Sequence, residues 1–169
     1  KWRQKDNSAE HVVKTHLTGS YNMENILAAV SVGLFFDLSP QQINTGIENY
    51  VPKNNRSQIT KTEKNTIVAD FYNANASSMV AALENMSVIS ADNKVVILGD
   101  MFELGEESYK EHQKLVNNAL ASNFDRLIFV GKEFYKHKSD QAQFFPTTTD
   151  AEQEVGSIKD SFILLKASR

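Results

Sequence analysis

Short apolar runs alternate with amphipathic segments along most of the chain. The runs 66–69 and 95–98 are continuous and apolar, which is typical of strands buried on both faces of a sheet. The segment 77–89 instead places Met79, Leu83 and Met86 on one side of a helix. The pattern predicts strands at 57–61, 65–70, 94–98, 126–130, 143–146 and 161–166, and helices at 77–89, 109–121, 132–138 and 150–159.

This alternation of strands and helices predicts an α/β fold with a doubly wound, mostly parallel sheet. The strands 57–61 and 65–70 are separated only by Thr62-Glu63-Lys64, so we expect an antiparallel hairpin at the sheet edge. Two capping boxes, Ser108 with Glu111 and Thr149 with Glu152, are expected at helix starts in this part.

The first 50 residues have a different pattern. Residues 11–18 alternate loosely and predict a strand, and 22–36 predicts a helix with an apolar face. A second helix is expected to open with Ser39 as N-cap, Pro40 at its first position and Gln42 closing a capping box, and to end near Glu48. We therefore expect a small strand-plus-helices unit before the sheet.

The segment 51–55 is polar, contains a proline and has no apolar periodicity, and so it is the best candidate for a domain boundary. We divide the chain into 1–50, a linker at 51–55, and 56–169. Short connections of this kind often act as hinges, and a hinge is expected here.

Composition narrows the class of protein. A chain of 169 residues with 41% hydrophobic residues can form one good core and a small appended unit. No run approaches the roughly 18 apolar residues of a membrane helix, so membrane insertion is not expected. The net charge of −3 and the absence of a basic stripe argue against nucleic acid binding. The lack of cysteine excludes disulfides and suits a cytoplasmic protein.

Two polar segments follow predicted strands. Asp70 to Asn75 comes after the first buried strand, and Gly99 to Gly105 comes after the next one. In an open α/β sheet, ligands bind at the carboxyl ends of the strands. The two segments therefore predict one binding site at this edge.

Four segments resemble sequence motifs of the Mur ligases, and they occur in the same order as in that family. Residues 70–79 are similar to the family pattern D-x-Y-N-A-N-P-x-S-M, and 98–105 to L-G-D-M-x-E-L-G. Residues 19–29 are close to G-x-[HY]-N-x-x-N-x-L-A-A, and 164–169 look like the start of L-K-[GA]-S-R-G. The resemblance is to the MurF branch, which joins D-alanyl-D-alanine to UDP-N-acetylmuramoyl-tripeptide with ATP and magnesium. Folylpolyglutamate synthase is a more distant candidate in the same superfamily.

The resemblance implies nucleotide roles for four residues. Asn22 and Asn25 would face the adenine, although Asn22 is equally suited to be a helix N-cap. Tyr21 takes the place where many relatives have His. Arg56 would bind phosphate with its planar guanidinium, and here Asn55 precedes it where the family commonly has Gly. Asp70 would accept hydrogen bonds from the ribose hydroxyls.

Five residues are expected at the substrate side. Tyr72, Asn73 and Asn75 would shape the first loop, with Asn75 also capping the following helix, where Ala76 replaces the family's Pro. The second loop would face the incoming dipeptide and its ammonium, with Asp100 and Glu103 as candidate carboxylates; a solvated acidic loop is the alternative. His112 lies on an apolar helix face and is interpreted as support for this loop.

The sequence has no G-x-x-x-x-G-K-[ST] motif, the loop that cradles ATP phosphates. The resemblance therefore implies a C-terminal piece of a monomeric ligase, with no catalytic residue, no metal ligand and no activity of its own. A noncatalytic nucleotide- or partner-binding module of the same fold is the alternative. A G-K-[ST] loop upstream of Lys1 in the parent reading frame would favour the ligase.

Overall fold

The computed structural model describes residues 1–5, 9–19, 22–53 and 55–168. The chain divides into two compact units, Lys1–Lys53 and Asn54–Arg169, and each is described by itself. The division falls within the segment 51–55.

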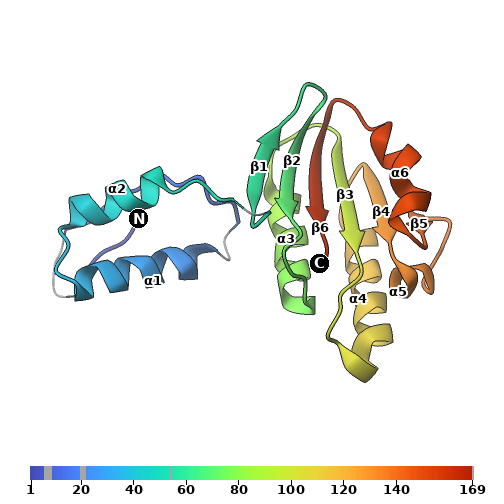
Figure 1. The fold of residues 1–169 in the computed structure, drawn as a ribbon, viewed down its shortest axis with the longest axis horizontal. Coiled ribbons are helices and arrows are strands. Elements are labelled where there is room, and N and C mark those ends of the chain that lie inside the picture. Colours follow the sequence, from blue (N-terminus) through green and yellow to red (C-terminus); the bar gives the residue numbers. More distant parts are fainter. Residues whose placement is uncertain (6–8, 20–21, 54, 169) are drawn as a thin grey trace. The chain divides into compact units, whose positions relative to one another are not determined.

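The first unit is built on two helices, α1 (Asn22–Phe35) and α2 (Pro40–Asn49) (Figure 1). The predicted start of α2 is confirmed: Ser39 is the N-cap, its hydroxyl accepts from the Gln42 N–H, and the Gln42 side chain returns to the Ser39 backbone. The two helices share a small apolar core made of Trp2, Ile26, Val30, Ile43 and Ile47.

The strand expected at 11–18 is wrong. In its place the structure has a single antiparallel bridge between Trp2 and His11, and residues 12–18 belong to no strand. A strand is stable only when a neighbour satisfies its backbone groups, and residues 12–18 pair with no described strand. Val13 and Leu17, which produced the alternation, pack instead against the core of the two helices.

The second unit is a six-stranded sheet with helices on both faces (Figure 1). The strands lie in the order β1-β2-β6-β3-β4-β5, where only β1 and β2 are antiparallel. Their bounds are β1 (Gln58–Lys61), β2 (Asn65–Asp70), β3 (Lys94–Gly99), β4 (Arg126–Val130), β5 (Gln143–Phe145) and β6 (Ser161–Lys166). The predicted fold class and edge hairpin are confirmed.

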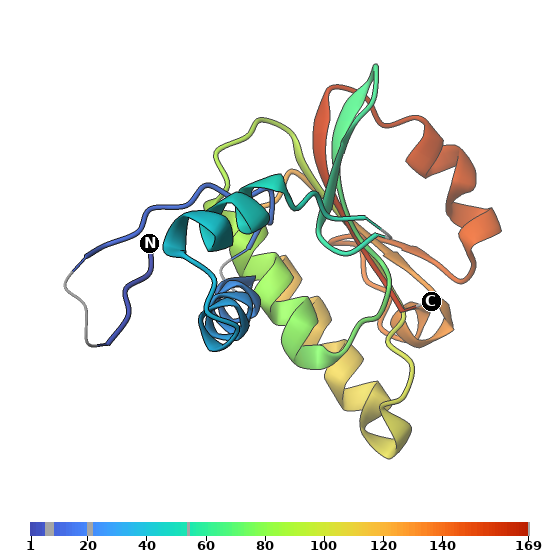
Figure 2. The same ribbon diagram turned by 60° about the vertical axis from the view of Figure 1, so that its left-hand side comes forward.

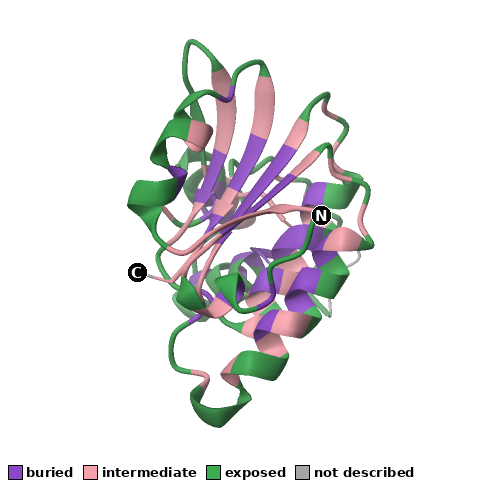
Figure 3. Ribbon diagram, turned by 90° about the vertical axis from the view of Figure 1, so that its right-hand side faces the viewer, coloured by how far each residue is buried: buried purple, intermediate pink, exposed green. Residues whose placement is uncertain are grey.

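The helices form two layers. The apolar cluster on one face joins α3 (Ala76–Val88), α4 (Ser108–Leu120) and α5 (Lys132–Tyr135) to the sheet, through side chains that include Met79, Leu115 and Phe134. On the other face, Ile158 and Val155 of the α6 region (α6, Thr148–Gly156) pack on Val95, Ile97 and Ile163. Figure 2 shows α3 and α4 together on one side and α6 on the other. The middle of the sheet is buried between these layers (Figure 3).

The two capping boxes predicted in this unit are wrong. A short 3₁₀ turn (Gly105–Glu107) leads directly into α4, so Ser108 is already helical and its N-cap, Glu107, makes no side-chain cap. Thr147 caps α6 by accepting from the Asp150 N–H, two residues before the predicted position. In both cases the helical turn or the cap begins before the predicted residue: at Gly105 for α4 and at Thr147 for α6.

Candidate functional site

The carboxyl ends of the parallel strands meet at one edge of the sheet, and the predicted loops lie there. Residues 70–75 follow β2, 99–104 follow β3, and 167–168 follow β6 between them. Because β1 runs antiparallel to β2, with Gln58 paired to Ala69, Arg56 and Ser57 arrive at the same edge. The structure thus brings seven of the nine predicted site residues to one edge of this unit: Arg56, Asp70, Tyr72, Asn73, Asn75, Asp100 and Glu103.

Asp70 is held by two contacts that its sequence position did not reveal. Its Oδ2 lies 2.6 Å from the Nζ of Lys166, its register partner on β6. Its Oδ1 accepts from the Ser57 N–H at 3.1 Å. The Lys166 side chain is 3% exposed and that of Asp70 15%, so this ion pair is largely shielded from water. Asp70 therefore anchors three segments of the edge, and its remaining lone pairs are available to a ligand.

Arg56 stacks on Tyr72. The guanidinium carbon lies 3.7 Å from the centre of the tyrosine ring, and Tyr72 is 46% exposed. No carboxylate among the described residues lies within ion-pair distance of Arg56. Stacking fixes the plane of the guanidinium while its N–H groups stay free for an anion. The arrangement suits the phosphate role expected of Arg56.

The backbone before Arg56 explains the departure from the family pattern. Asn55 has a φ of +58°, in the left-handed region that favours glycine. Asparagine is the residue that tolerates this region best after glycine, so it can replace the glycine that the family commonly has here. Ser57 also has a positive φ, of +49°, and its N–H thereby reaches Asp70.

Asn73 and Asn75 shape the first loop from within. The Asn73 side chain accepts from the Ala74 N–H at 2.8 Å. Asn75 is the N-cap of α3, as predicted, and forms a capping box with Ser78. The loop is therefore fixed by its own polar side chains before any ligand is considered.

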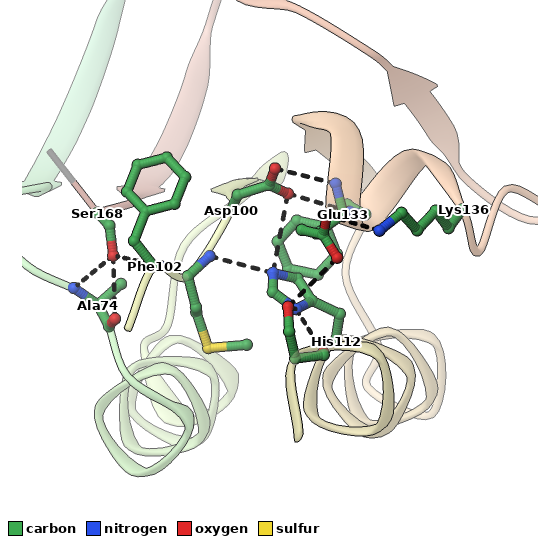
Figure 4. A network of polar contacts seen from close by, with 10 residues as sticks. Ala74, Asp100, Phe102, His112, Glu133, Lys136 and Ser168 are labelled. Atoms are coloured by element: carbon green, nitrogen blue, oxygen red, sulfur yellow. Dashed lines mark hydrogen bonds and ion pairs between the residues drawn. The ribbon is translucent and has the colours of Figure 1, made fainter. Parts of the chain in front are cut away.

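Asp100 lies on the second loop and caps the start of helix α5. Its two oxygens accept from the backbone N–H groups of Glu133 and Phe134, each at 3.0 Å, at the start of α5 (Figure 4). Gly131 permits this approach, since a Cβ there would lie 2.2 Å from Asp100 Cγ, and its φ of +131° also requires glycine. Glu103 is exposed and has a φ of +68°. Its carboxylate accepts no hydrogen bond and forms no ion pair within the described part of the chain, so it remains available.

His112 supports this loop, as expected. It is fully buried, and its Nε2 accepts from the Met101 N–H at 3.1 Å while Nδ1 lies 2.7 Å from the Ser108 carbonyl (Figure 4). These partners require a neutral ring with the proton on Nδ1. Nearby, the Lys136 ammonium bonds Glu133 at 2.6 Å and holds the pKa of that carboxyl below its ordinary value.

Two residues at this edge were missed as site residues. Lys166 is 2% exposed and pairs with Asp70, and Ser168 forms hydrogen bonds to both loops. The sequence placed Lys166 at the end of an apolar strand, opposite the acid that ends β2. A basic and an acidic residue at the ends of two buried strands is a signal that could have indicated the pair.

In the first unit, the two asparagines lie together. The Asn25 Nδ2 donates to the Asn22 Oδ1 at 3.0 Å, and the Asn22 Nδ2 donates to the Thr18 carbonyl. Asn22 is the first residue of α1 and is buried, whereas Asn25 is exposed at the helix start. Tyr21 lies outside the described residues.

Within the described ranges, no three His, Asp or Glu side chains gather in a way that could hold a metal ion. In the same ranges, no helix combines the length and apolarity that crossing a bilayer requires.

A comparison with known protein families supports the interpretation of these motifs, and the match covers about two thirds of the sequence. Residues 55–169 match the family described as Mur ligase, glutamate ligase domain. The chain belongs to the Mur ligase family. The predicted resemblance is thereby confirmed at the level of the family, and the second unit is its C-terminal domain.

Individual Mur ligases share the same region. The UDP-N-acetylmuramoyl-tripeptide–D-alanyl-D-alanine ligase of Treponema pallidum is 31% identical over 171 residues, which cover 93% of this chain and 36% of that protein. The crystal structure of MurF from Acinetobacter baumannii has a TM-score of 0.78 and 27% identity over 93% of this chain and 36% of its own. MurF of Thermotoga maritima in complex with ADP shares the fold, with a TM-score of 0.74 and 19% identity over 90% of this chain and 35% of its own. The chain thus spans about a third of the length of these relatives.

Proposed function

We propose that this chain is the C-terminal part of an ATP-dependent ligase that adds D-alanyl-D-alanine to UDP-N-acetylmuramoyl-tripeptide. The observation that carries the proposal is similarity over 93% of the chain to a protein named for this activity. The two segments that resemble the family patterns D-x-Y-N-A-N and L-G-D-M-x-E-L-G lie together at the carboxyl edge of the sheet, where α/β proteins bind ligands.

In the reaction, a tripeptide carboxylate oxygen would first attack the γ-phosphorus of ATP; the bond from this phosphorus to the bridging oxygen breaks, and ADP leaves with the electron pair. The dipeptide amine would then attack the carbonyl carbon of this acyl phosphate; a C–N bond forms, the C–O bond to phosphate breaks, phosphate leaves with the electron pair, and the amine loses a proton to solvent. Such a step depends mainly on positioning and on neutralising phosphate charge. We assign this chain to those two tasks and place no catalytic residue in it.

Arg56 is the proposed phosphate contact and Asp70 the proposed ribose contact. Support comes from the stacked, unpaired guanidinium of Arg56 and from the rigid setting of Asp70 between Lys166 and Ser57. Asn22 and Asn25 are proposed to contact adenine, because a carboxamide can both donate to and accept from a purine edge.

On the acceptor side, Glu103 is the proposed partner of the dipeptide ammonium, since its carboxylate is exposed and uncommitted. Asp100, Tyr72, Asn73 and Asn75 would shape the site. For magnesium, which would balance the ATP phosphates, we assign no ligand here, because Asp70 and Asp100 already direct their oxygens to Lys166 and to backbone N–H groups.

The experiment compares the full-length ligase with this chain. Phosphate release by the full-length protein should require ATP, UDP-N-acetylmuramoyl-tripeptide and D-alanyl-D-alanine together. The chain alone should release none, since it lacks a phosphate-cradling loop, and should bind ATP only in the millimolar range, roughly −4 kcal/mol. Dipeptide-independent turnover by the full-length protein, or micromolar ATP binding by the chain, would contradict the proposal.

A further inference from the structure

The last residues after β6 lie between the two proposed ligand loops. In the sheet, β6 is flanked by β2 on one side and β3 on the other. The segment 70–75 continues from β2 and the segment 99–104 continues from β3, so Ser168 has one loop on each side. This placement follows from the strand order alone and is independent of the motifs.

Ser168 bonds to both loops at once (Figure 4). Its hydroxyl donates to the Ala74 carbonyl at 3.0 Å and accepts from the Ala74 N–H at 3.3 Å. The same oxygen accepts from the Phe102 N–H at 3.3 Å. The Ser168 N–H donates to the Asp100 carbonyl at 3.2 Å. A single residue therefore joins the loop after β2 to the loop after β3.

The tip of the second loop is Phe102 and Glu103, which lie between the anchored Asp100 and Met101 on one side and Leu104, packed against the core, on the other. Asp100 and Met101 are fixed by α5 and by His112, but Phe102 is 54% exposed and Glu103 is exposed at a positive φ. The Phe102 N–H bond to Ser168 is the last anchor before Glu103. The position of the Glu103 carboxylate relative to the first loop thus depends on the Ser168 hydroxyl.

We propose that Ser168 is a positioning residue, which sets the acceptor loop 99–104 against the nucleotide loop 70–75. This inference rests on the proposed function, in which the first loop holds the nucleotide and the second receives the dipeptide. If the loop 99–104 shifts relative to 70–75, the Glu103 carboxylate no longer meets the ammonium of a dipeptide placed for attack on the acyl phosphate, so binding of the dipeptide weakens. Ser168 touches neither reactant in this assignment and acts through Phe102 and Glu103.

The kinetic test uses the full-length ligase with Ser168→Ala, Ser168→Thr and a matched control. Ser168→Ala should raise the KM for D-alanyl-D-alanine by about tenfold and change the KM for ATP less than about twofold, since Asp70 and Arg56 keep their own supports. Ser168→Thr keeps the hydroxyl and should restore the dipeptide KM.

The control is Asn65→Ala. Asn65 joins β2 to β6 in the same way at the opposite edge of the sheet, donating to the Ile158 carbonyl at 2.8 Å and accepting from the Ser161 N–H at 3.1 Å. It should lower the melting temperature without changing the dipeptide KM. An unchanged dipeptide KM in Ser168→Ala, equal increases for both substrates, or the same increase in Asn65→Ala would overturn the proposal. If Ser168→Ala does not fold, Ser168→Cys, whose thiol is a weak hydrogen-bonding group of similar size, allows the same comparison.

A second measurement separates this proposal from the proposed function. In the 169-residue chain, the amide proton of Phe102 should exchange with solvent about tenfold faster in Ser168→Ala than in the wild type, and at the wild-type rate in Asn65→Ala. Unchanged exchange would overturn the role of Ser168. If the full-length protein instead fails to use D-alanyl-D-alanine while Phe102 exchange responds as expected, the proposed function fails and the link between the loops remains.

Discussion

Asp70 and Lys166 face each other at the ends of two neighbouring parallel strands and form an ion pair with an N–O distance of 2.6 Å. Both side chains are largely buried, and the second carboxylate oxygen is bonded to the Ser57 N–H. The residue with the strongest nucleotide assignment is therefore also part of the folded framework. We therefore expect a substitution of Asp70 to affect stability as well as the proposed ribose contact.

Removing one member of this pair should destabilise the fold more than removing both. Lys166→Met leaves a buried carboxylate without its cation and should lower the free energy of unfolding by about 3 kcal/mol or more, whereas Asp70→Asn with Lys166→Met should recover much of it. Urea denaturation of the four proteins gives the coupling energy. Additive effects of the two substitutions would mean that the pair contributes little.

For the ligase, Asp70→Ala should raise the ATP requirement by about tenfold or more. Two lost hydrogen bonds to ribose hydroxyls would each account for about 0.5–1.5 kcal/mol. The dipeptide requirement should change less, because that ligand is assigned to 99–104. Lys166→Met is the matched control, since it disturbs the pair but keeps the carboxylate. A variant that melts lower yet keeps its ATP dependence would show that Asp70 is structural only.

The stack between Arg56 and Tyr72 predicts a graded series. Tyr72→Phe keeps the ring under the guanidinium and should leave the KM for ATP within about twofold of the wild type. Tyr72→Leu removes the ring and should raise this KM by about two- to fivefold, since an exposed cation–π contact contributes on the order of 0.5–1 kcal/mol. Steady-state kinetics of the ligase checks both. Equal effects of Phe and Leu would exclude the ring as the support of Arg56.

His137 makes stability depend on pH. Its Nδ1 lies 3.0 Å from the Gln113 Oε1, and its Nε2 is buried without a partner. Burial lowers the pKa of the ring below its ordinary value of 6.5, the Lys136 ammonium adds to the effect, and Glu133 opposes it. The unfolded chain then binds a proton more readily than the folded one, so this contribution is present above pH 6.5 and is lost as the pH falls through the folded pKa. His137→Phe should lose less stability than the wild type between pH 7.5 and 5.5 in urea denaturation. Identical losses would contradict the assignment.

The sequence predicted the sheet unit well because its strands are buried on both faces. A short, continuous apolar run between polar segments is typical of a strand buried on both faces. The bounds of β2, β4 and β6 match the prediction. The stretch 11–18 misled because its alternation reflects packing on two helices. The contacts of Lys166 with Asp70 and of Ser168 with both loops were missed. They exist because β6 lies between β2 and β3, and the order of strands in a sheet cannot be predicted from local periodicity.

The segment 51–55 should be the first site of limited proteolysis. Lys53 is exposed, whereas the bond after Arg56 leads into Ser57, which is 4% exposed and hydrogen-bonded to Asp70. Trypsin should therefore cut after Lys53 before it cuts after Arg56 or within 65–166, and Lys53→Gln should slow the first cut. Mass spectrometry of early fragments decides the order. Early cleavage within 94–130 would count against a boundary at 51–55.

Gly131→Ala should uncouple Asp100 from α5. A Cβ at this position would meet the Asp100 Cγ at 2.2 Å and its Oδ1 at 2.4 Å, and alanine is strained at a φ of +131°. Displacing the carboxylate leaves the N–H groups of Glu133 and Phe134 without their acceptor, and we expect a loss of about 2 kcal/mol or more in the free energy of unfolding.

Gly156→Ala is the matched control for this substitution. Gly156 ends α6, and no atom lies within 4 Å of an added Cβ, so alanine should leave stability unchanged or raise it by up to about 1 kcal/mol. Urea denaturation compares the two variants, and the exchange rate of the Met101 amide, which is bonded to His112, reports whether the disturbance reaches the acceptor loop. A Gly131→Ala protein as stable as the wild type would mean that Asp100 can move without cost, and the acceptor loop would then lack the rigid base on which the position of Glu103 depends.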